Sequence, residues 1–424
     1  MSAVELLPQG TTPQRPAATV YEWPTTPGAS DTMRADLCWS LAELGAPTST
    51  AKDLLRVVTA AYVADCTTSR PAQALHRDLQ LSVHLETPDA WTQAALDGAV
   101  DLLHWLTGDT WTLEVLTAQP TADQAQPAAN ADPAHTVSLL SGGLDSLCGA
   151  LLRLDQAEST LFLGHVDRAN AVSKAQRLVH EQLLARHPGL RYQRYALRPT
   201  AEVRESTPRT RSLLFMAMAV AAASGHGARQ VLVPENGFTS INPPLEPSRG
   251  GPLTTRSTHP WTFHALDGLL HELSLDAITV SNPHGHLTKG ELVAEALRPR
   301  SAEDRHLAAV TLSCAKPNAG RPKGGNPNLN CGLCIACLVR RGAFIAANRQ
   351  DETTYLIDTL TGDAKQALLH HRRHDIAAWR YATEAGFDDI RVLASGLWPP
   401  NTDFDNVLAI CHRGLKELRR VHIS

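Results

Sequence analysis

Residues 138–152, SLLSGGLDSLCGALL, place two adjacent glycines between a run of strand-forming residues and a helical pattern. Glycine has no Cβ atom, so the backbone of such a turn can approach an anion closely. The flanking serines supply hydroxyl donors, and the aspartate can order the loop or hold a magnesium ion. A turn of this kind at the start of a helix predicts a phosphate site, formed by Ser141, Gly142, Gly143, Leu144, Asp145 and Ser146.

Two other glycine-containing motifs are excluded for this turn. A Walker A loop requires GxxxxGK[ST], which does not occur here, and a nucleophile elbow requires glycine where Leu139 stands. A glycine turn that only joins a strand to a helix is the remaining alternative to phosphate binding.

Four cysteines have the spacing of a metal site. Cys331, Cys334 and Cys337 form a CxxCxxC run, and Cys314 lies upstream of it. Two-residue gaps let one knuckle place several sulfur atoms on one tetrahedral ion, and the upstream cysteine completes four ligands. Zinc held by four protein ligands is structural and stabilises its loop. The alternatives are unliganded thiols and an iron–sulfur cluster, although a ferredoxin run needs a further cysteine where Arg341 stands.

Composition narrows the class of protein. The chain has 424 residues, of which 43% are apolar and 19% charged, and its net charge is −4. These values are typical of a globular protein of two or three domains and disfavour a nucleic-acid partner. The start has no signal-peptide pattern, and no run of 18 apolar residues occurs. We therefore expect a cytoplasmic protein that makes no use of a membrane.

The elements that position these residues follow from composition and periodicity. From residue 135 onward strand and helix patterns alternate, which predicts an α/β fold with a doubly wound parallel sheet. Before it we expect helices at 33–44, 49–65 and 89–106 and strands at 79–86 and 111–118. The predicted segments are a flexible arm (1–30), an N-terminal α+β accessory domain (31–118), a linker (119–134), the nucleotide domain with its zinc site (135–350) and a helical C-terminal extension (351–424).

The SGGxDS pattern resembles the signature of the PP-loop family of N-type ATP pyrophosphatases. The resemblance implies a loop that holds the pyrophosphate of ATP, with magnesium, while a substrate oxygen attacks the α-phosphorus to give an adenylate. Within that family, residues 137–346 look most like 7-cyano-7-deazaguanine synthase (QueC). The similarity rests on the loop, the four cysteines, Lys289 and Glu291 in HLTKGELV, and Arg211 in RTRSLLF.

That resemblance implies a substrate and a reaction. ATP would activate 7-carboxy-7-deazaguanine, ammonia would give the amide, and a second ATP would dehydrate it to the nitrile. The implied catalytic residues are Ser141, Asp145, Ser146 and Lys289, and Arg211 would contact the nucleotide. Where the family has Tyr-Pro-Asp, this chain has His259-Pro260-Trp261. We expect Glu235, Asn236 and His259 to contact the substrate instead.

Chain length separates this sequence from the short members of the family. Longer members with an added N-terminal domain occur in antiphage operons of the Qat type, and residues 61–111 resemble that domain. The resemblance implies a defence role with protein partners from the same operon, and an amine acceptor that is either ammonia or an amino group of a partner. The alternatives are a tRNA-modifying PP-loop enzyme and a non-catalytic nucleotide-binding assembly subunit.

Overall fold

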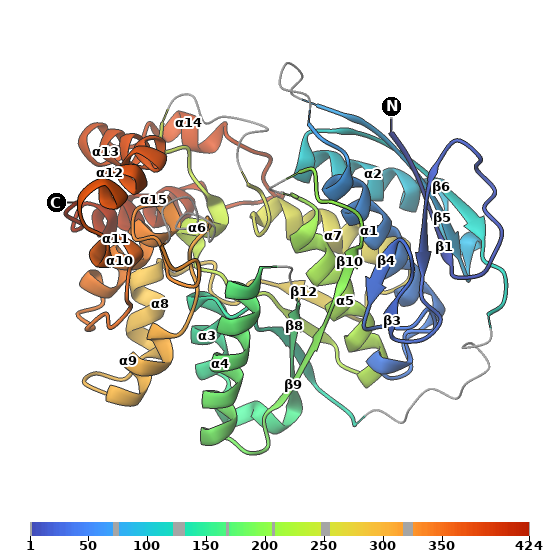
Figure 1. Ribbon diagram of the computed structural model, residues 1–424, viewed down its shortest axis with the longest axis horizontal. Coiled ribbons are helices and arrows are strands. Elements are labelled where there is room, and N and C mark those ends of the chain that lie inside the picture. Colours follow the sequence, from blue (N-terminus) through green and yellow to red (C-terminus); the bar gives the residue numbers. More distant parts are fainter. Residues whose placement is uncertain are drawn as a thin grey trace.

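A five-stranded parallel sheet forms the centre of the protein (Figure 1). The computed structural model describes residues 2–70, 76–121, 132–166, 169–205, 208–246, 255–316 and 325–423. The strand order in the central sheet is β12-β11-β7-β8-β9, and every neighbouring pair is parallel. The strands are β7 (Thr136–Leu139), β8 (Thr160–His165), β9 (Arg191–Tyr195), β11 (Gln230–Leu232) and β12 (Thr279–Ser281). The predicted α/β class with parallel strands is confirmed.

Helices cover both faces of this sheet. In β8, Leu161 and Leu163 belong to one hydrophobic cluster and Phe162 to another, because successive strand residues point to opposite faces. The first cluster contains α5 (Arg211–His226) and α7 (Pro260–Glu272), and the second contains α3 (Leu144–Leu151), α4 (Asn170–Arg186), α8 (Lys289–Ala296) and α9 (Ala302–Ala309). The strands are apolar on both sides because both sides are covered.

A second parallel sheet lies at the N-terminal end of the chain. Its order is β2-β1-β5-β6, formed by β1 (Ser2–Pro8), β2 (Thr19–Trp23), β5 (Asp78–Leu85) and β6 (Thr110–Thr117). Two helices, α1 (Ser49–Thr67) and α2 (Gln93–Thr107), pack on it. The region is therefore α/β, and the predicted α+β class for it is wrong.

The predicted flexible arm over residues 1–30 is also wrong. Leu6 and Leu7 in β1 are fully buried, and the buried Glu5 accepts hydrogen bonds from the backbone amides of Gln14 (2.7 Å) and Arg15 (2.9 Å). The glycines and prolines of this segment therefore lie in turns around ordered strands. β1 pairs with β5, which is distant in sequence, so local composition carries no sign of the pairing.

The predicted helix at 33–44 is replaced by β4 (Met33–Ala35) and a 3-10 helix (Ala42–Leu44). β4 pairs with β3 (Gly28–Ala29) and with β10 (Leu197–Pro199), both antiparallel. Met33, Ala35, Leu37 and Trp39 are fully buried, whereas Arg34 is exposed. The apolar period is therefore two residues, the period of an extended chain.

The two parallel sheets share one hydrophobic core. A single cluster of buried residues runs from β1 through α1 and α5 to β7 and β11. Helices α1 and α5 pack closely. The 3-10 helix before α1 also contacts α5, because Gly225 of α5 leaves no room for a Cβ atom beside the carbonyl oxygen of Leu44. Within the predicted linker, residues 122–131 lie outside the described residues, and Ala134 is buried in the shared core.

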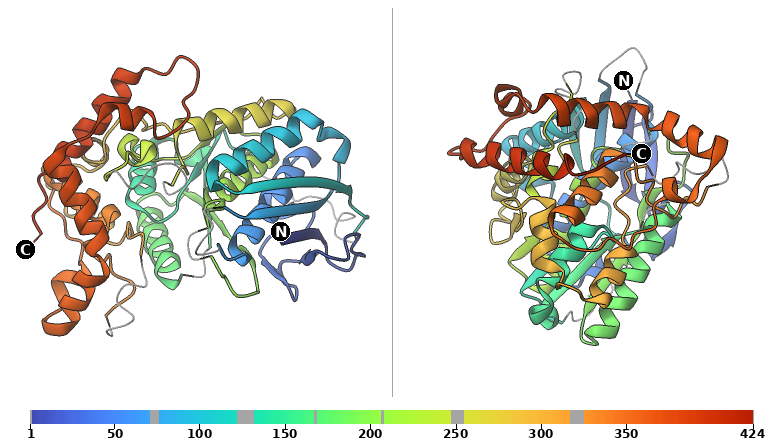
Figure 2. Two further views of the ribbon diagram at one scale, coloured as in Figure 1. Left: turned by 90° about the horizontal axis from the view of Figure 1, so that it is seen from above. Right: turned by 90° about the vertical axis from the view of Figure 1, so that its left-hand side faces the viewer.

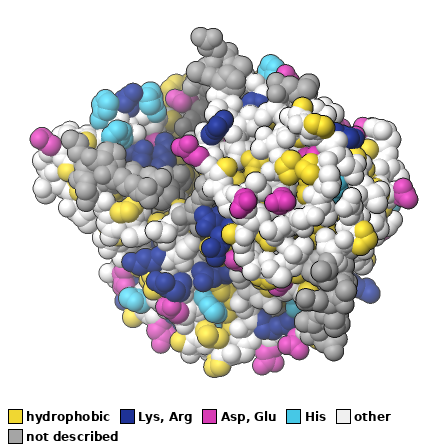
Figure 3. Space-filling model, turned by 45° about the vertical axis from the view of Figure 1, so that its right-hand side comes forward, with side chains coloured by type: hydrophobic (Ala, Val, Ile, Leu, Met, Phe, Trp, Pro, Cys, Tyr) yellow, Lys and Arg dark blue, Asp and Glu magenta, His cyan; other side chains and the backbone are white. Residues whose placement is uncertain are grey.

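The C-terminal helices gather at the end of the molecule opposite the N-terminal sheet (Figure 2). They are α10 (Ile335–Ala346), α11 (Leu356–Thr359), α12 (Gly362–His371), α13 (Arg373–Ala385), α14 (Asp389–Leu393) and α15 (Phe404–Leu418), and α15 packs against α10 and the short α6 (Gly237–Ile241). Acidic and basic side chains both occur on the face drawn in Figure 3. Among the described residues, no helix is long and apolar enough to cross a membrane.

Candidate functional site

The glycine turn is folded around its two serines. Ser146 Oγ accepts a hydrogen bond from the Ser141 amide and lies 3.1 Å from the Gly143 carbonyl oxygen, to which it donates. Gly142 has a φ of 81°, and a Cβ there would lie 2.9 Å from the Gln176 amide nitrogen. Glycine is thus required both by backbone conformation and by close approach. No described side chain caps α3, which begins at Leu144, so its first amides are available to an anion.

Asp145 lies in a buried charged cluster directly behind the turn. Its carboxylate forms an ion pair with Lys289, the first residue of α8, and accepts a hydrogen bond from Asn236 Nδ2 (3.2 Å). Asn236 also donates to Glu235 Oε1 (3.1 Å). Thr288 caps α8 and thereby fixes the direction in which Lys289 leaves the helix.

The protonation states in this cluster follow from burial and charge. Burial raises the pKa of Glu235 well above its usual value, and the neighbouring Asp145 carboxylate raises it further. Burial opposes ionisation of Asp145 too, but the Lys289 ammonium and hydrogen bonds from its neighbours lower the pKa of that carboxyl. The Lys289–Asp145 pair therefore favours the charged forms of both residues, whereas burial and the Asp145 carboxylate favour the protonated form of Glu235.

A cavity of about 470 Å³ opens beside the turn. The turn and Lys289 line one part of it, and Glu235, the residues around α6, and the segment 255–258 line another. The remaining wall comes from the cysteine region, including Leu312, Ser313 and Lys316. The structure thus brings the glycine turn, the buried Lys289 ammonium and the Glu235 carboxyl group together at one cavity.

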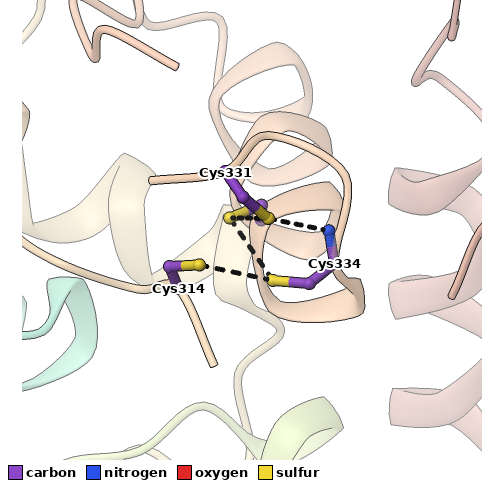
Figure 4. A group of neighbouring side chains, drawn as sticks. Cys314, Cys331 and Cys334 are labelled. Carbon is purple, nitrogen blue, oxygen red and sulfur yellow. Dashed lines mark hydrogen bonds between the residues drawn. The ribbon is translucent and has the colours of Figure 1, made fainter. Parts of the chain in front are cut away.

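The four predicted cysteines converge on one point, and Figure 4 labels Cys314, Cys331 and Cys334 among them. All four are buried, and their sulfur atoms lie within 4.8 Å of one another. The Sγ–Sγ distances are 3.9 Å for Cys314–Cys334, 3.9 Å for Cys331–Cys337 and 3.5 Å for Cys334–Cys337. A tetrahedron of sulfurs around one zinc ion has edges of about 3.8 Å, because the Zn–S bond is about 2.3 Å long. The arrangement is compatible with zinc, whereas a cluster of several iron atoms holds its sulfurs farther apart.

The cysteine site is coupled directly to the cavity. The Leu312 amide donates to the Gly142 carbonyl oxygen (3.0 Å), and the Lys316 amide points to Cys314 Sγ (3.4 Å). The Lys316 ammonium, which pairs with Asp375 of α13 (2.6 Å), lines the cavity. Sequence reasoning missed both residues of this pair; the position of Lys316 two residues after a predicted metal ligand was the available signal.

Four predicted site residues are not part of the cavity lining: Gly142, Arg211, Asn236 and His259. Gly142 lies within the turn, and Asn236 is fully buried behind it, where it donates to Asp145. His259 caps α7 by accepting from the Trp261 amide (3.2 Å), and burial, with the nearby Arg256, lowers its pKa to about 3. Arg211 begins α5 on the other face of the sheet, with its guanidinium 5.5 Å from the centre of the Phe215 ring. Glu291 completes the cap of α8 and pairs with Arg413.

Comparison with known proteins identifies distant relatives. No family model matches the chain. It is 25% identical over 162 residues to the 7-cyano-7-deazaguanine synthases of two strains of Rickettsia bellii, covering 37% of this chain and 62% of each relative. The chain therefore spans about three fifths of the length of these relatives. It is 26% identical over 246 residues to the 7-cyano-7-deazaguanine synthase of Rhizorhabdus wittichii, covering 54% of this chain and 98% of that protein. The chain is thus similar, at low identity, to 7-cyano-7-deazaguanine synthases.

Proposed function

We propose that this protein is a PP-loop enzyme that activates 7-carboxy-7-deazaguanine with ATP and passes the activated acyl group to an amine. The observation that carries the proposal is the glycine turn whose Asp145 is paired with the buried Lys289, at one cavity with Glu235. The similarity to 7-cyano-7-deazaguanine synthases supports the choice of substrate.

In the first step, a substrate carboxylate oxygen attacks the α-phosphorus of ATP, and pyrophosphate leaves. The amides of Gly143 and Leu144 and the hydroxyl of Ser141 would hold the phosphates, because they surround the N-terminus of α3. The hydroxyl of Ser146, which donates to the Gly143 carbonyl oxygen, would join them by turning its hydrogen toward a phosphate. Lys289 keeps Asp145 ionised, and Asp145 is the residue that would hold magnesium. When bound, magnesium neutralises part of the phosphate charge.

In the second step, the amine nitrogen attacks the acyl carbon, AMP leaves, and one proton is released. A positioned acyl adenylate needs little more from the protein than orientation and neutralisation of charge. Ammonia gives the amide, which a second ATP can dehydrate to the nitrile. An amino group of a partner protein gives a deazaguanine amide on that protein with a single ATP.

We further propose that the enzyme works in the cytoplasm as part of an antiphage system of the Qat type, with proteins of the same operon as partners. This finer assignment is supported by the length of the chain: the longer alignment covers 98% of its relative but only 54% of this chain, so nearly half of this chain has no counterpart there. The cysteine site would hold zinc as a structural ion, because all four of its ligands come from the protein.

The test is pyrophosphate exchange into ATP by the purified protein with magnesium, with and without 7-carboxy-7-deazaguanine. Exchange that depends on the carboxylate supports the proposal. Exchange that depends on tRNA instead would favour a tRNA-modifying enzyme, and absence of any turnover would favour an assembly subunit. Mass spectrometry of the products then separates nitrile, free amide and protein conjugate.

A further inference from the structure

The segment 255–262 forms part of the cavity wall and also contacts the N-terminal region. Thr255, Ser257 and Thr258 line the cavity, whereas Arg256 between them extends away from it. The cavity side of the segment is held by α6 and the residues after it: Asn242 Nδ2 donates to the Thr255 carbonyl oxygen (2.9 Å), and Ser240 donates to that of Thr258. The opposite side is held by one residue of α2, Trp105.

Trp105 makes three kinds of contact with this segment. Its indole Nε1 donates to Thr262 Oγ1 (2.9 Å), and Thr262 in turn donates to the Arg256 carbonyl oxygen (2.6 Å). The Arg256 guanidinium lies 3.9 Å from the centre of the indole ring and donates to the Trp105 carbonyl oxygen (3.1 Å). The His259 ring packs edge-on at 5.3 Å. Hydrogen bond, cation–π contact and ring packing therefore fix the same short segment.

The neighbouring elements hold Trp105 itself in place. Helices α2 and α7 lie side by side (Figures 1 and 2). Trp105 is 6% exposed, and Arg209 donates to the carbonyl oxygen of Thr107 in the same last turn of α2 (2.9 Å). From the C-terminal part of the chain, Trp398 packs on His259 at 4.6 Å. Three parts of the sequence thus meet directly behind one wall of the cavity.

We infer that Trp105 is a positioning residue for the cavity: it fixes the segment 255–258, so that the N-terminal region shapes the substrate site without touching the substrate. The inference rests on the proposed function only in that this wall receives the 7-carboxy-7-deazaguanine. It assigns a task in the substrate site to the N-terminal region.

Hydrogen exchange measured by mass spectrometry tests the anchor without any activity. The amides of His259, Trp261 and Thr262 are hydrogen-bonded and give a protected signal. In Trp105→Phe an aromatic ring remains but the indole donor is lost. We expect exchange in 255–262 to be about fivefold to tenfold faster, the effect of one buried hydrogen bond on a local opening equilibrium. Residues 139–151 should exchange as in the wild type.

The matched control is Trp111→Phe. Trp111 is similarly buried in β6, and its indole Nε1 also donates to a threonine hydroxyl at 2.9 Å. That acceptor is Thr107, which belongs to α2 and not to the segment 255–262. Thr262→Val removes the acceptor on the other side and should reproduce Trp105→Phe, and the double variant should add little. Unchanged exchange in 255–262 in Trp105→Phe, or the same acceleration in Trp111→Phe, would overturn the inference.

Steady-state pyrophosphate release provides the second readout. For Trp105→Phe and Arg256→Met, we expect the KM for 7-carboxy-7-deazaguanine to rise about tenfold while the KM for ATP stays within about twofold of the wild type, because a small displacement of a binding wall is costly. Faster exchange with an unchanged KM for the carboxylate would show that this wall does not receive the substrate. If the wild type shows no carboxylate-dependent turnover, the proposed function fails, whereas the exchange experiment still decides whether Trp105 anchors the wall.

Discussion

The hydroxyl of Ser141 is the residue-scale feature that separates a phosphate site from a glycine turn of purely structural purpose. Ser141 is solvent-exposed at the cavity, and among the described residues its hydroxyl has a long contact with the Gly143 amide (3.4 Å) and a hydrogen bond with Ser146. Ser141→Ala should therefore leave the fold intact but lower pyrophosphate release about a hundredfold, as loss of one donor to a developing charge does.

Ser138→Ala is the matched control for this variant. Ser138 lies three residues earlier in β7, is fully buried, and its hydroxyl has no hydrogen-bond partner among the described residues. Its removal should leave both activity and thermal stability close to those of the wild type. Equal pyrophosphate release by Ser141→Ala and wild type would leave the turn as a structural element and favour the assembly-subunit alternative.

Glu235 makes stability depend on pH. Its folded-state pKa lies above the unfolded value, so the folded protein binds more protons than the unfolded chain between the two pKa values. The free energy of unfolding therefore falls as pH rises through that interval. Glu235→Gln, which cannot ionise, should gain melting temperature relative to the wild type as pH rises above the ordinary glutamate pKa of 4.5. Glu295→Gln, the same exchange at an exposed position of α8, is the matched control. A melting-temperature difference between Glu235→Gln and the wild type that stays constant with pH would contradict a raised pKa.

At the scale of elements, sequence prediction succeeded where local spacing carries the information. The glycine turn, the CxxCxxC run and the alternation of strand and helix after residue 135 are all local patterns, and the structure forms a parallel sheet and a four-cysteine cluster from them. It failed for β1 and β4, whose partners β5 and β10 are distant in sequence. In both cases the backbone hydrogen bonds of the strand are made with a partner that is distant in sequence, so the local composition of the segment does not predict the strand.

The cysteine knuckle is the element whose loss should be most damaging. Cys334→Ser removes one of four ligands, so bound zinc, measured by elemental analysis, should fall from about one ion per chain to near zero. The melting temperature should fall by on the order of 10 °C, since metal binding contributes folding free energy. Because Leu312 bonds to Gly142, pyrophosphate release should fall as well.

Cys38→Ser is the control for the knuckle variant. Cys38 is buried outside the cluster, where its Sγ lies 3.0 Å from the Ser40 hydroxyl. This variant should keep its zinc. A Cys334→Ser protein with full stability and only its activity lost would contradict a structural ion.

The whole molecule explains why the complete site was beyond sequence analysis. Asp145, Glu235 and Lys289 come from three separate turns of the central sheet, and Lys316 is paired by Asp375 from a C-terminal helix. Only the shared core and the packing of α2 on α7 bring Trp105 behind the wall at Thr258. Conversely, His259 was expected at the substrate because of its place in a motif, but the packing of two tryptophans around it directs it away from the cavity.

We expect the amine acceptor to be an amino group of a partner protein. Of the residues after 350, only Asp375 lines the cavity, and no residue before 141 does so, within the part of the chain that the structure describes. Most of the N-terminal region and of the C-terminal extension therefore lies outside the cavity wall. Their surfaces are where a partner protein can bind. Incubation with ATP, magnesium, 7-carboxy-7-deazaguanine and the proteins of the same operon should add to one of them the mass of the acid less one water. Rapid conversion of the carboxylate to the nitrile with ammonium, with no mass added to any partner, would contradict this, because dehydration to a nitrile requires the free primary amide that a protein conjugate cannot supply.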